Sequence, residues 1–178
     1  MLPQSYKINP TQQTTSVIIQ LRARQLSWWR RIWGFQGLDS MLDGQGRFLY
    51  VKGTITGMLY TFANIYLPNK RQAQFLRKAL NKLSDFSEGT LVLGGDFNTP
   101  LDPIMDSSTR HSSIPQLHIR SMKRALGDME LVDCWRTLHP TTRDFTYYSA
   151  LHDRYSQIDY IGCYQPGWTP QHGQITAR

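Results

Sequence analysis

The sequence predicts an α+β fold in which one sheet packs on another and helices lie on the outside. Short apolar runs of strand length are separated by two longer segments in which apolar residues recur every three or four positions, as in amphipathic helices. Two of the strand-like runs are joined by the dipeptide Thr56-Gly57, which suits a tight hairpin turn. Other runs are separated by a helical segment. Hairpins combined with helical crossovers are typical of an α+β or mixed α/β domain.

The first 40 residues differ from the rest of the chain. They carry five Lys or Arg residues against the single acid Asp39, and they are rich in tryptophan. Residues 15–21 are β-branched and apolar, which indicates a buried strand. The tryptophans of residues 28–33 flank two arginines. They fit a membrane-surface helix, a DNA-stacking patch or, as we favour, core aromatics with exposed arginines. We therefore divide the chain into residues 1–40 and residues 41–178.

From residue 41 the expected elements follow one another closely. Residues 43–46 read as a turn, and Asn69 followed by Gln72 is a good N-cap pair for a helix. The run of residues 90–95 is wholly apolar, as in a buried strand, and a long polar loop follows it. The expected strands cover residues 47–55, 58–66, 90–95, 145–148 and 157–162, and the expected helices cover residues 70–86 and 117–128.

Composition sets limits on the function. The 178 residues are 40% hydrophobic and 19% charged, as in a soluble globular domain, and no apolar run is long enough to span a bilayer, so we expect no membrane partner. Cys134 and Cys163 are the only cysteines, so we expect neither a disulfide framework nor a zinc cluster, and a nuclear or cytoplasmic location. The net charge is +7, with 14 Arg against 6 Lys, which favours a nucleic-acid partner.

The sharpest candidate site follows the apolar run of residues 90–95. There Asp96 and Asn98 stand at positions i and i+2, so they point to the same side of an extended segment. A carboxylate can accept a proton from water or hold a metal ion, and an amide can donate to a phosphoryl oxygen. This pairing suits water attack on a phosphodiester. The alternative is a plain Asx turn that closes the strand.

Two further candidate sites lie on other expected strands. Tyr66 and Asn69 can both donate hydrogen bonds to a phosphate; the alternatives are a core aromatic for Tyr66 and the helix cap for Asn69. In the last expected strand, alternation places Gln157 and Asp159 on one face. An Asp inside an apolar strand needs a His or Arg partner, unless it lies in solvent on an edge strand.

The order of these signals resembles one family. The chain reads NIYLPN, a helix, LVLGGDFNTPL, a long loop, HPTTRDFTYYS and SQIDYI, an order that resembles the exonuclease–endonuclease–phosphatase family. The stretches GGDFNTPLDPIMDSSTR and LVDCWRTLHPTTRDFTYYSALHDRYSQIDYI are similar to the endonuclease domains of LINE-type (non-LTR) retrotransposons, which resemble apurinic-site repair nucleases. The resemblance covers residues 43–162 and implies a DNase-like, four-layer α/β/β/α sandwich.

The resemblance implies a role for each candidate residue. Asp96 would be the general base or water-orienting carboxylate and Asn98 would bind the phosphate beside it, both as candidate ligands of Mg²⁺ or Mn²⁺. Tyr66 and Asn69 would contact the scissile phosphate, and Asp159 would orient a catalytic histidine. The candidate substrate-binding residues are Arg110, Thr146 and Ser156. The implied reaction is metal-dependent nicking of DNA for retrotransposition; the alternatives are a non-catalytic DNA-binding remnant and a phosphomonoesterase of the same superfamily.

Two departures from the family pattern bear on activity. The family carries a metal-binding Glu in a Gln-Glu context near its start and a Ser-Asp-His run near its end. Neither Glu88 nor Glu130 nor any of the five histidines stands in such a context. We therefore expect a partial copy, truncated at both ends, with impaired activity in isolation. A longer parent polyprotein with a reverse transcriptase is an implied partner.

Overall fold

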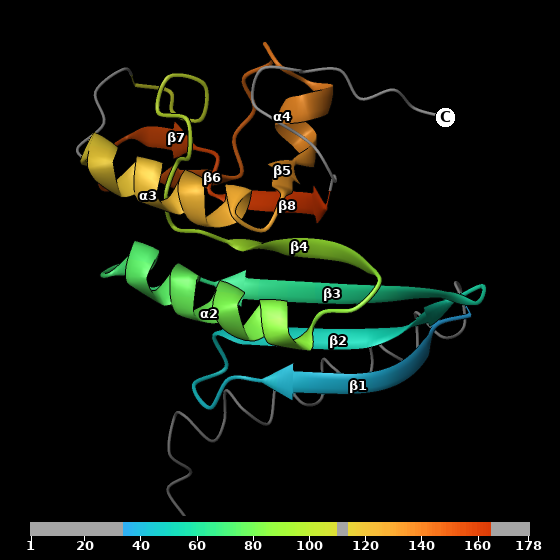
Figure 1. Ribbon diagram of the computed structural model, residues 1–178. Helices are drawn as coiled ribbons and strands as arrows, with labels where there is room; N and C mark the ends of the chain where they lie inside the picture. Colours follow the sequence, from blue (N-terminus) through green and yellow to red (C-terminus); the bar gives the residue numbers. More distant parts are fainter. Residues whose placement is uncertain (1–33, 110–113, 165–178) are drawn as a thin grey trace, which may run out of the picture.

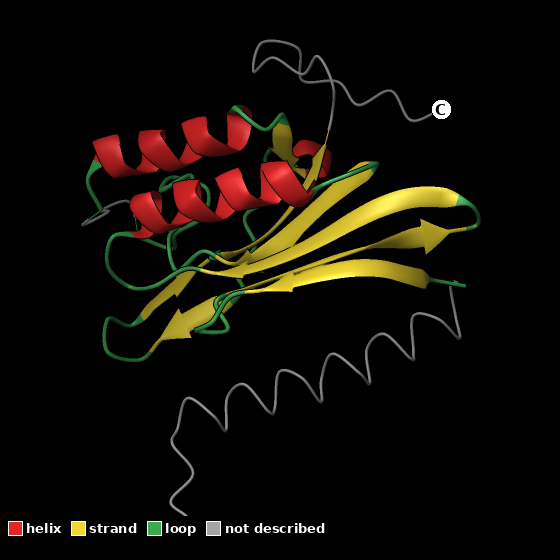
Figure 2. Cartoon of the chain, turned by 60° about the horizontal axis from the view of Figure 1, so that its bottom comes forward, coloured by secondary structure: helices red, strands yellow, loops and turns green. Residues whose placement is uncertain are grey.

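The computed structural model describes residues 34–109 and 114–164. Within them, a six-stranded mixed sheet has the order β1-β2-β3-β4-β8-β5, and helices α2 and α3 lie side by side on one of its faces (Figure 1, Figure 2). The strands of this sheet are β1 (Gln36–Leu42), β2 (Phe48–Ile55), β3 (Met58–Tyr66), β4 (Thr90–Asp96), β5 (Leu131–Asp133) and β8 (Asp159–Tyr164). The remaining elements are α2 (Gln72–Phe86), α3 (Gln116–Gly127), α4 (Cys134–Leu138) and a separate pair of strands, β6 (Tyr147–Ser149) and β7 (Arg154–Ser156).

The hydrophobic core lies between the large sheet and the two helices. Alternate residues of each strand point to this face of the sheet. They pack against the apolar stripe of α2, whose spacing of three and four residues predicted the helix. The hydroxyl of Tyr50 in β2 donates a hydrogen bond to the carbonyl of Ala79 in α2 at 2.8 Å. The core includes Phe48, Tyr50, Ala63, Ile65, Leu76, Leu80, Leu83, Leu91, Leu93, Met122 and Ala125.

The β2–β3 hairpin closes as the sequence predicts. Thr56 and Gly57 have φ angles of 50° and 81°, and positive φ at both central residues gives a turn whose twist matches that of the flanking strands. The two-residue turn fixes the strand register from Ile55 opposite Met58 onward along both strands. β3 then continues through α2 into β4, which lies parallel to β3. The carboxyl ends of β3 and β4 therefore meet at the same edge of the sheet.

The α+β class is confirmed, and so are the strands expected at residues 47–55, 58–66 and 90–95 and both long helices. The described residues form a large sheet, a pair of helices covering one face of it, and the small β6–β7 sheet. The short elements β5, β7 and α4 were not expected. β1 was not expected either, and it crosses the boundary that the sequence analysis placed after residue 40. Residues 15–21 and 28–33 lie outside the described residues. No helix among the described residues is long and apolar enough to cross a membrane.

The expected N-cap pair of Asn69 and Gln72 is wrong. Arg71 precedes the first helical residue with a left-handed φ of 57°, and no side chain caps the helix. Gln72 is used elsewhere: its Nε2 donates to the carbonyl of Asn98 at 3.0 Å, and its Oε1 lies 2.9 Å from Nε2 of His118. Gln72 thus ties the start of α2 to the turn after β4 and to α3, and the side chain of Asn69 is left exposed.

The two cysteines are paired with each other, which their number alone did not predict. Cys134 at the start of α4 and Cys163 in β8 form a disulfide, with their Cα atoms 6.2 Å apart. β5 pairs with β8, and Val132 in β5 stands opposite Cys163 in β8. Cys134 follows Val132 by two residues, so it lies close to Cys163. A count of two cysteines excludes a framework of several bridges, but it does not exclude a single bridge.

Candidate active site

Three of the candidate residues form a row across neighbouring strands. Tyr66 ends β3, Asp96 ends β4 and Asp159 begins β8; Tyr66 stands opposite Asp96, and Asp96 stands opposite Asp159. Ile65 and Tyr160, their neighbours in the chain, point into the core, so alternation places the row on the sheet face away from the helices. Residues paired in this way have Cβ atoms about 5 Å apart. Three separate motifs of the sequence therefore meet at one place.

The carboxyl of Asp96 has a perturbed pKa. Burial raises this pKa above 3.8, and the nearby charge of Asp159 raises it further, while a hydrogen bond from the backbone of Asn98 lowers it. That bond joins the Asn98 N–H to Oδ1 of Asp96 at 2.7 Å, and Oδ2 accepts no hydrogen bond from a described residue. Two carboxylates that repel each other favour a proton or a cation between them.

The turn after β4 is held in a strained but well-supported conformation. Asn98 has a φ of 48°, and its Nδ2 donates to the carbonyl of Leu67 at 2.6 Å. Gly95 has a φ of 148°, and a Cβ there would lie 1.9 Å from the carbonyl oxygen of Ile65. The Asx turn that was an alternative to a catalytic role is present, but it uses only Oδ1 of Asp96. The turn and a role of Oδ2 in catalysis are therefore compatible.

Tyr66 lies at the surface and has a basic neighbour that the sequence analysis missed. Its side chain is 48% exposed, which excludes the core-aromatic alternative. The guanidinium of Arg47 lies over the Tyr66 ring, 5.9 Å from its centroid, and the Tyr66 N–H donates to the Arg47 carbonyl at 2.7 Å. The register of the hairpin could have predicted that Arg47 lies next to Tyr66. A two-residue turn sets Phe48 opposite Ile65, and one residue further along both strands places Arg47 opposite Tyr66.

A cleft of about 370 Å³ opens beside Asp159. Two acids, Asp144 and Asp159, line it, and no Lys or Arg does. A phosphodiester entering this cleft would meet negative charge, so its binding there calls for a cation. The lining residues are Gly95, Trp135, Asp144, Thr146, Gln157, Asp159, Tyr160 and Ile161.

The predicted substrate-binding residues have different surroundings. Oγ1 of Thr146 accepts hydrogen bonds from the backbone N–H groups of Ile158 and Asp159, at 3.1 and 3.2 Å, and so fixes the start of β8. Ser156 is only 5% exposed, which argues against a direct contact with a ligand at the surface. Arg110 lies outside the described residues. The role of all three in binding DNA stays a prediction.

Asp159 and Gln157 do not share a face as predicted, because β8 begins only at Asp159. Gln157 is buried in the preceding loop, where its Oε1 accepts from Arg136 at 3.2 Å. β8 lies between β4 and β5, so Asp159 is on an inner strand, yet its side chain is exposed. No hydrogen bond joins Asp159 to a histidine among the described residues; His118, for example, bonds to Gln72.

A buried carboxylate holds the loop after β4 against the start of β8. Asp106 is 2% exposed, and Arg136 Nη2 donates to its Oδ1 at 2.7 Å. Its Oδ2 accepts from the hydroxyl of Tyr160 at 2.9 Å and from the backbone of Asp102 at 2.7 Å. The hydroxyl of Tyr160 also accepts from the backbone of Leu101 at 2.7 Å. Because Tyr160 follows Asp159, this network positions the end of the row.

The donor atoms of the row fit a hard divalent cation. The described residues contain no group of three or more His, Cys, Asp or Glu side chains arranged to hold a metal. Mg²⁺, however, is commonly held by one or two carboxylates, with water and substrate phosphates as its other ligands. Asp96 and Asp159 supply two such carboxylates, and Asn98, whose backbone N–H donates to Asp96, carries an amide oxygen as a further donor of the same class.

No family model matches the chain. It is 30% identical over 124 residues to the "Transposon TX1 uncharacterized 149 kDa protein" of Xenopus laevis, a match that covers 65% of this chain and 9% of that protein. The structure matches the endonuclease domain of TRAS1, a telomere-specific non-LTR retrotransposon, with a TM-score of 0.52 and 16% identity over 72% of this chain and 56% of the other. The chain has this endonuclease fold.

The same endonuclease fold is found in the catalytic domain of Xenopus laevis APE2, which matches with a TM-score of 0.52 and 20% identity over 69% of this chain and 47% of the other. The resemblance to non-LTR retrotransposon endonuclease domains that the sequence predicted is therefore confirmed. The chain spans about half the length of the two solved structures and a small part of the transposon protein.

Proposed function

We propose that this chain carries the hydrolytic site of a divalent-metal-dependent DNA endonuclease, which nicks target DNA in retrotransposition. The observation that carries the proposal is the row of Tyr66, Asp96 and Asp159, which brings together the ends of three strands beside an acidic cleft. The endonuclease fold supports the same reaction class. A longer product that includes a reverse transcriptase is the partner we propose.

In the proposed mechanism each residue acts from its observed position. Asp96 accepts the proton of the attacking water through Oδ2 as the water oxygen bonds to phosphorus; the bond from phosphorus to the 3′ oxygen breaks, and that oxygen takes a proton from solvent. The raised pKa of Asp96 makes it a better proton acceptor at neutral pH. One hydrogen of the Asn98 side-chain amide bonds to the carbonyl of Leu67, and the other donates to a phosphoryl oxygen. The exposed hydroxyl of Tyr66 and the exposed amide of Asn69 donate to the other phosphate oxygens.

Mg²⁺ or Mn²⁺, held by Asp96 and Asp159 with Asn98 beside them, would neutralise charge on the phosphate. The cation would also relieve the repulsion between the two carboxylates. We further propose that activity in isolation is weak, because neither glutamate lies near the row. Glu88 precedes β4, at the opposite end of that strand from Asp96, and forms an ion pair with Lys52, while Glu130 precedes β5.

Plasmid nicking tests the proposal. The purified chain is incubated with supercoiled plasmid in Mg²⁺ and in EDTA, beside Asp96→Ala, Asp159→Asn and the control Asp39→Ala, whose exposed carboxylate lies in β1. We expect slow nicking that needs Mg²⁺, is abolished by Asp96→Ala and is unchanged by Asp39→Ala. A folded chain that never nicks, or nicking that survives Asp96→Ala, would overturn the proposal.

A second candidate function is DNA binding without cleavage. The net charge of +7 favours it, because cations that neutralise phosphates release counterions and give salt-dependent affinity. Binding that weakens with salt and persists in EDTA, in a chain that does not nick, would assign this function in place of the first.

A further inference from the structure

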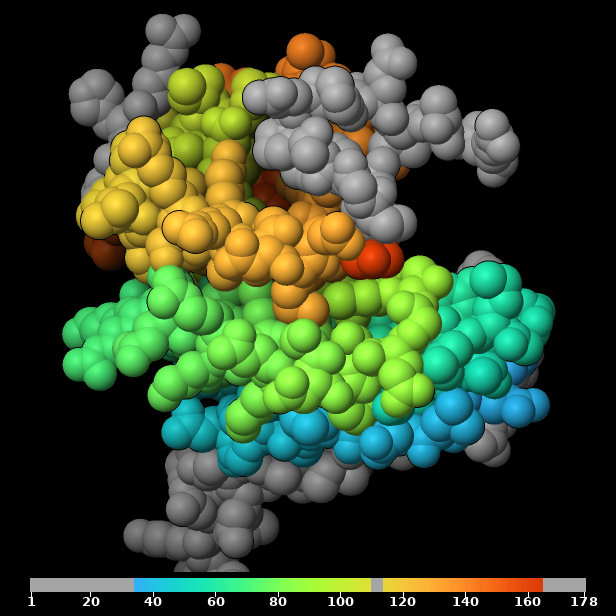
Figure 3. Space-filling model, viewed as in Figure 1, coloured from blue at the N-terminus to red at the C-terminus, as the bar shows by residue number. Residues whose placement is uncertain are grey.

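The charges of the described residues are separated between two parts of the fold. We define the helix layer as residues 70–86 and 116–128, which contain α2 and α3. It holds eight Lys or Arg residues against Asp85 and Asp128, a net charge of +6. The other described residues hold five Lys or Arg against eleven acids, a net charge of −6. Figure 3 views the side on which α2 (green) and α3 (yellow to orange) form one continuous surface.

The cations of the helix layer are available to a ligand. All eight side chains are exposed, and the two ion pairs among the described residues, Lys52–Glu88 and Arg136–Asp106, involve none of them. Cations without an acidic partner keep their full attraction for an external anion. The eight residues are Lys70, Arg71, Arg77, Lys78, Lys82, Arg120, Lys123 and Arg124.

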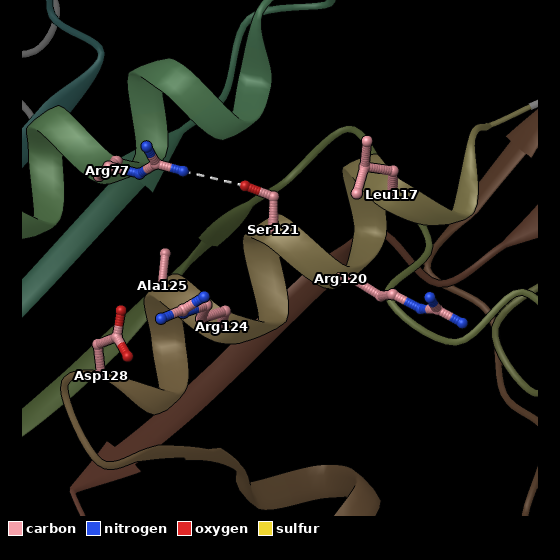
Figure 4. A pocket seen from close by; sticks show the side chains of 7 residues that line it. All are labelled: Arg77, Leu117, Arg120, Ser121, Arg124, Ala125 and Asp128. Atoms are coloured by element: carbon pink, nitrogen blue, oxygen red, sulfur yellow. Dashed lines mark hydrogen bonds between the residues drawn. The ribbon is translucent and has the colours of Figure 1, made fainter.

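Three of these arginines line a groove of about 410 Å³ between the two helices (Figure 4). Arg77 reaches across from α2 and donates to the hydroxyl of Ser121 at 3.1 Å. Arg120 and Arg124 stand four residues apart on α3, about 6 Å along the helix axis, and Figure 4 shows Arg120 extending away from α2. Arg120 and Arg124 therefore follow one another along α3, with Arg77 of α2 across the groove and Asp128 at its end. Cations spread over this length suit a linear polyanion better than a single phosphate.

We propose that the helix layer binds the phosphodiester backbone of double-stranded DNA. Arginine forks suit phosphate oxygens, and backbone contacts position a duplex without reading its sequence. A duplex fits better than a single strand because single-strand sites stack bases on exposed aromatic rings. Within the helix layer the aromatic residues, Phe75 and Phe86, are partly or fully buried in the core. The surface lies across the sheet from Asp96, so it is separate from the cleft; the choice of DNA over RNA rests on the proposed function.

Fluorescence anisotropy with a labelled 20-base-pair DNA duplex, in EDTA and over a range of NaCl concentrations, tests the proposal. The variant combines Arg77→Ala, Arg120→Ala and Arg124→Ala, and the matched control replaces the same three residues with Lys. Each lost phosphate contact lowers the slope of log affinity against log salt by about 1. We expect the Ala variant to lose about 2 to 3 units of slope and on the order of a hundredfold in affinity at 0.1 M salt, and the Lys control to keep most of both.

The outcomes separate this proposal from the proposed function. EDTA prevents metal-dependent nicking, so the binding of the duplex by the wild type and by the Ala variant is measured without any contribution from cleavage. An Ala variant that melts like the wild type yet binds with the same slope would overturn the proposal. Equal affinity for a single strand of the same sequence, or for an RNA duplex, would overturn the assignment to double-stranded DNA.

Discussion

Replacing Asp106 with Ala should destabilise the fold more than any change to an exposed acid. The carboxylate accepts three hydrogen bonds, from Arg136, from Tyr160 and from the backbone of Asp102, at 2.7 to 2.9 Å. Its loss leaves the guanidinium of Arg136 without its anion, with the Arg136 side chain only 20% exposed. Removal of one partner from a buried ion pair costs about 3 to 5 kcal/mol. That is a large share of the roughly 5 to 15 kcal/mol by which domains are stable.

Urea unfolding followed by circular dichroism measures this loss. Asp106→Asn is a milder variant that keeps an acceptor oxygen in place, and we expect it to lose about half as much free energy of unfolding. If Asp106→Ala does not fold, the loss measured for Asp106→Asn tests the prediction in its place. Asp85→Asn is the control, because Asp85 is exposed on α2 and has no ion-pair partner among the described residues. A loss below about 1 kcal/mol in Asp106→Ala would refute the view that this network holds the loop to β8.

Three further predictions follow from the same region. Gly95→Ala should lower the free energy of unfolding in urea by at least about 2 kcal/mol, because its Cβ would meet a backbone carbonyl of β3. The control Gly94→Ala should lower it by less, because its Cβ would have no neighbour closer than 3.8 Å. Cys163→Ser, or reduction of the bond between Cys163 and Cys134, should lower the free energy of unfolding by about 3.6 kcal/mol. This is the loss of chain entropy expected for a bridge between residues 29 positions apart. An unchanged free energy of unfolding on reduction would mean that the bond is not formed in solution. Asp96→Asn should be slightly more stable than the wild type at pH 7, by at most about 0.5 kcal/mol. A carboxyl whose folded pKa is raised binds protons more tightly when folded, so wild-type stability falls as pH rises above 3.8, and the advantage of the variant should vanish below that pH.

The sequence predicted the parts of the fold that depend on local pattern. The apolar stripe of α2, the Thr56-Gly57 turn and the run of residues 90–95 each follow from the spacing of a few neighbouring residues, and the structure contains all three elements. β5, at three residues, and α4, at five, are too short for any periodicity to show. The capping prediction failed because Gln72 bonds to His118 and Asn98, which are distant in sequence.

The residues of the candidate site could be named from the sequence, but the charge interactions between them could not. Order and spacing singled out Tyr66, Asp96 and Asp159, and the strand pairing then placed them in one row. The raised pKa of Asp96 depends on burial and on the opposing Asp159, which is known only once β4 and β8 are paired. Asp106 gave no signal in the sequence, because its partners follow it by 30 residues or more or belong to the backbone.

The separation of charge between the helix layer and the rest of the described residues makes this part of the chain an electric dipole with no net charge. In the field of a polyanion this charge separation turns α2 and α3 toward the anion, and the remaining residues of the chain add seven positive charges to the attraction. That orientation carries Asp96 and Asp159 away from the approaching molecule. The rate of encounter should then fall steeply as salt shortens the range of the field, to about 10 Å at 0.1 M. A strand held on the helix layer would reach the carboxylate row by bending around the edge of the sheet or by meeting a second molecule of the protein.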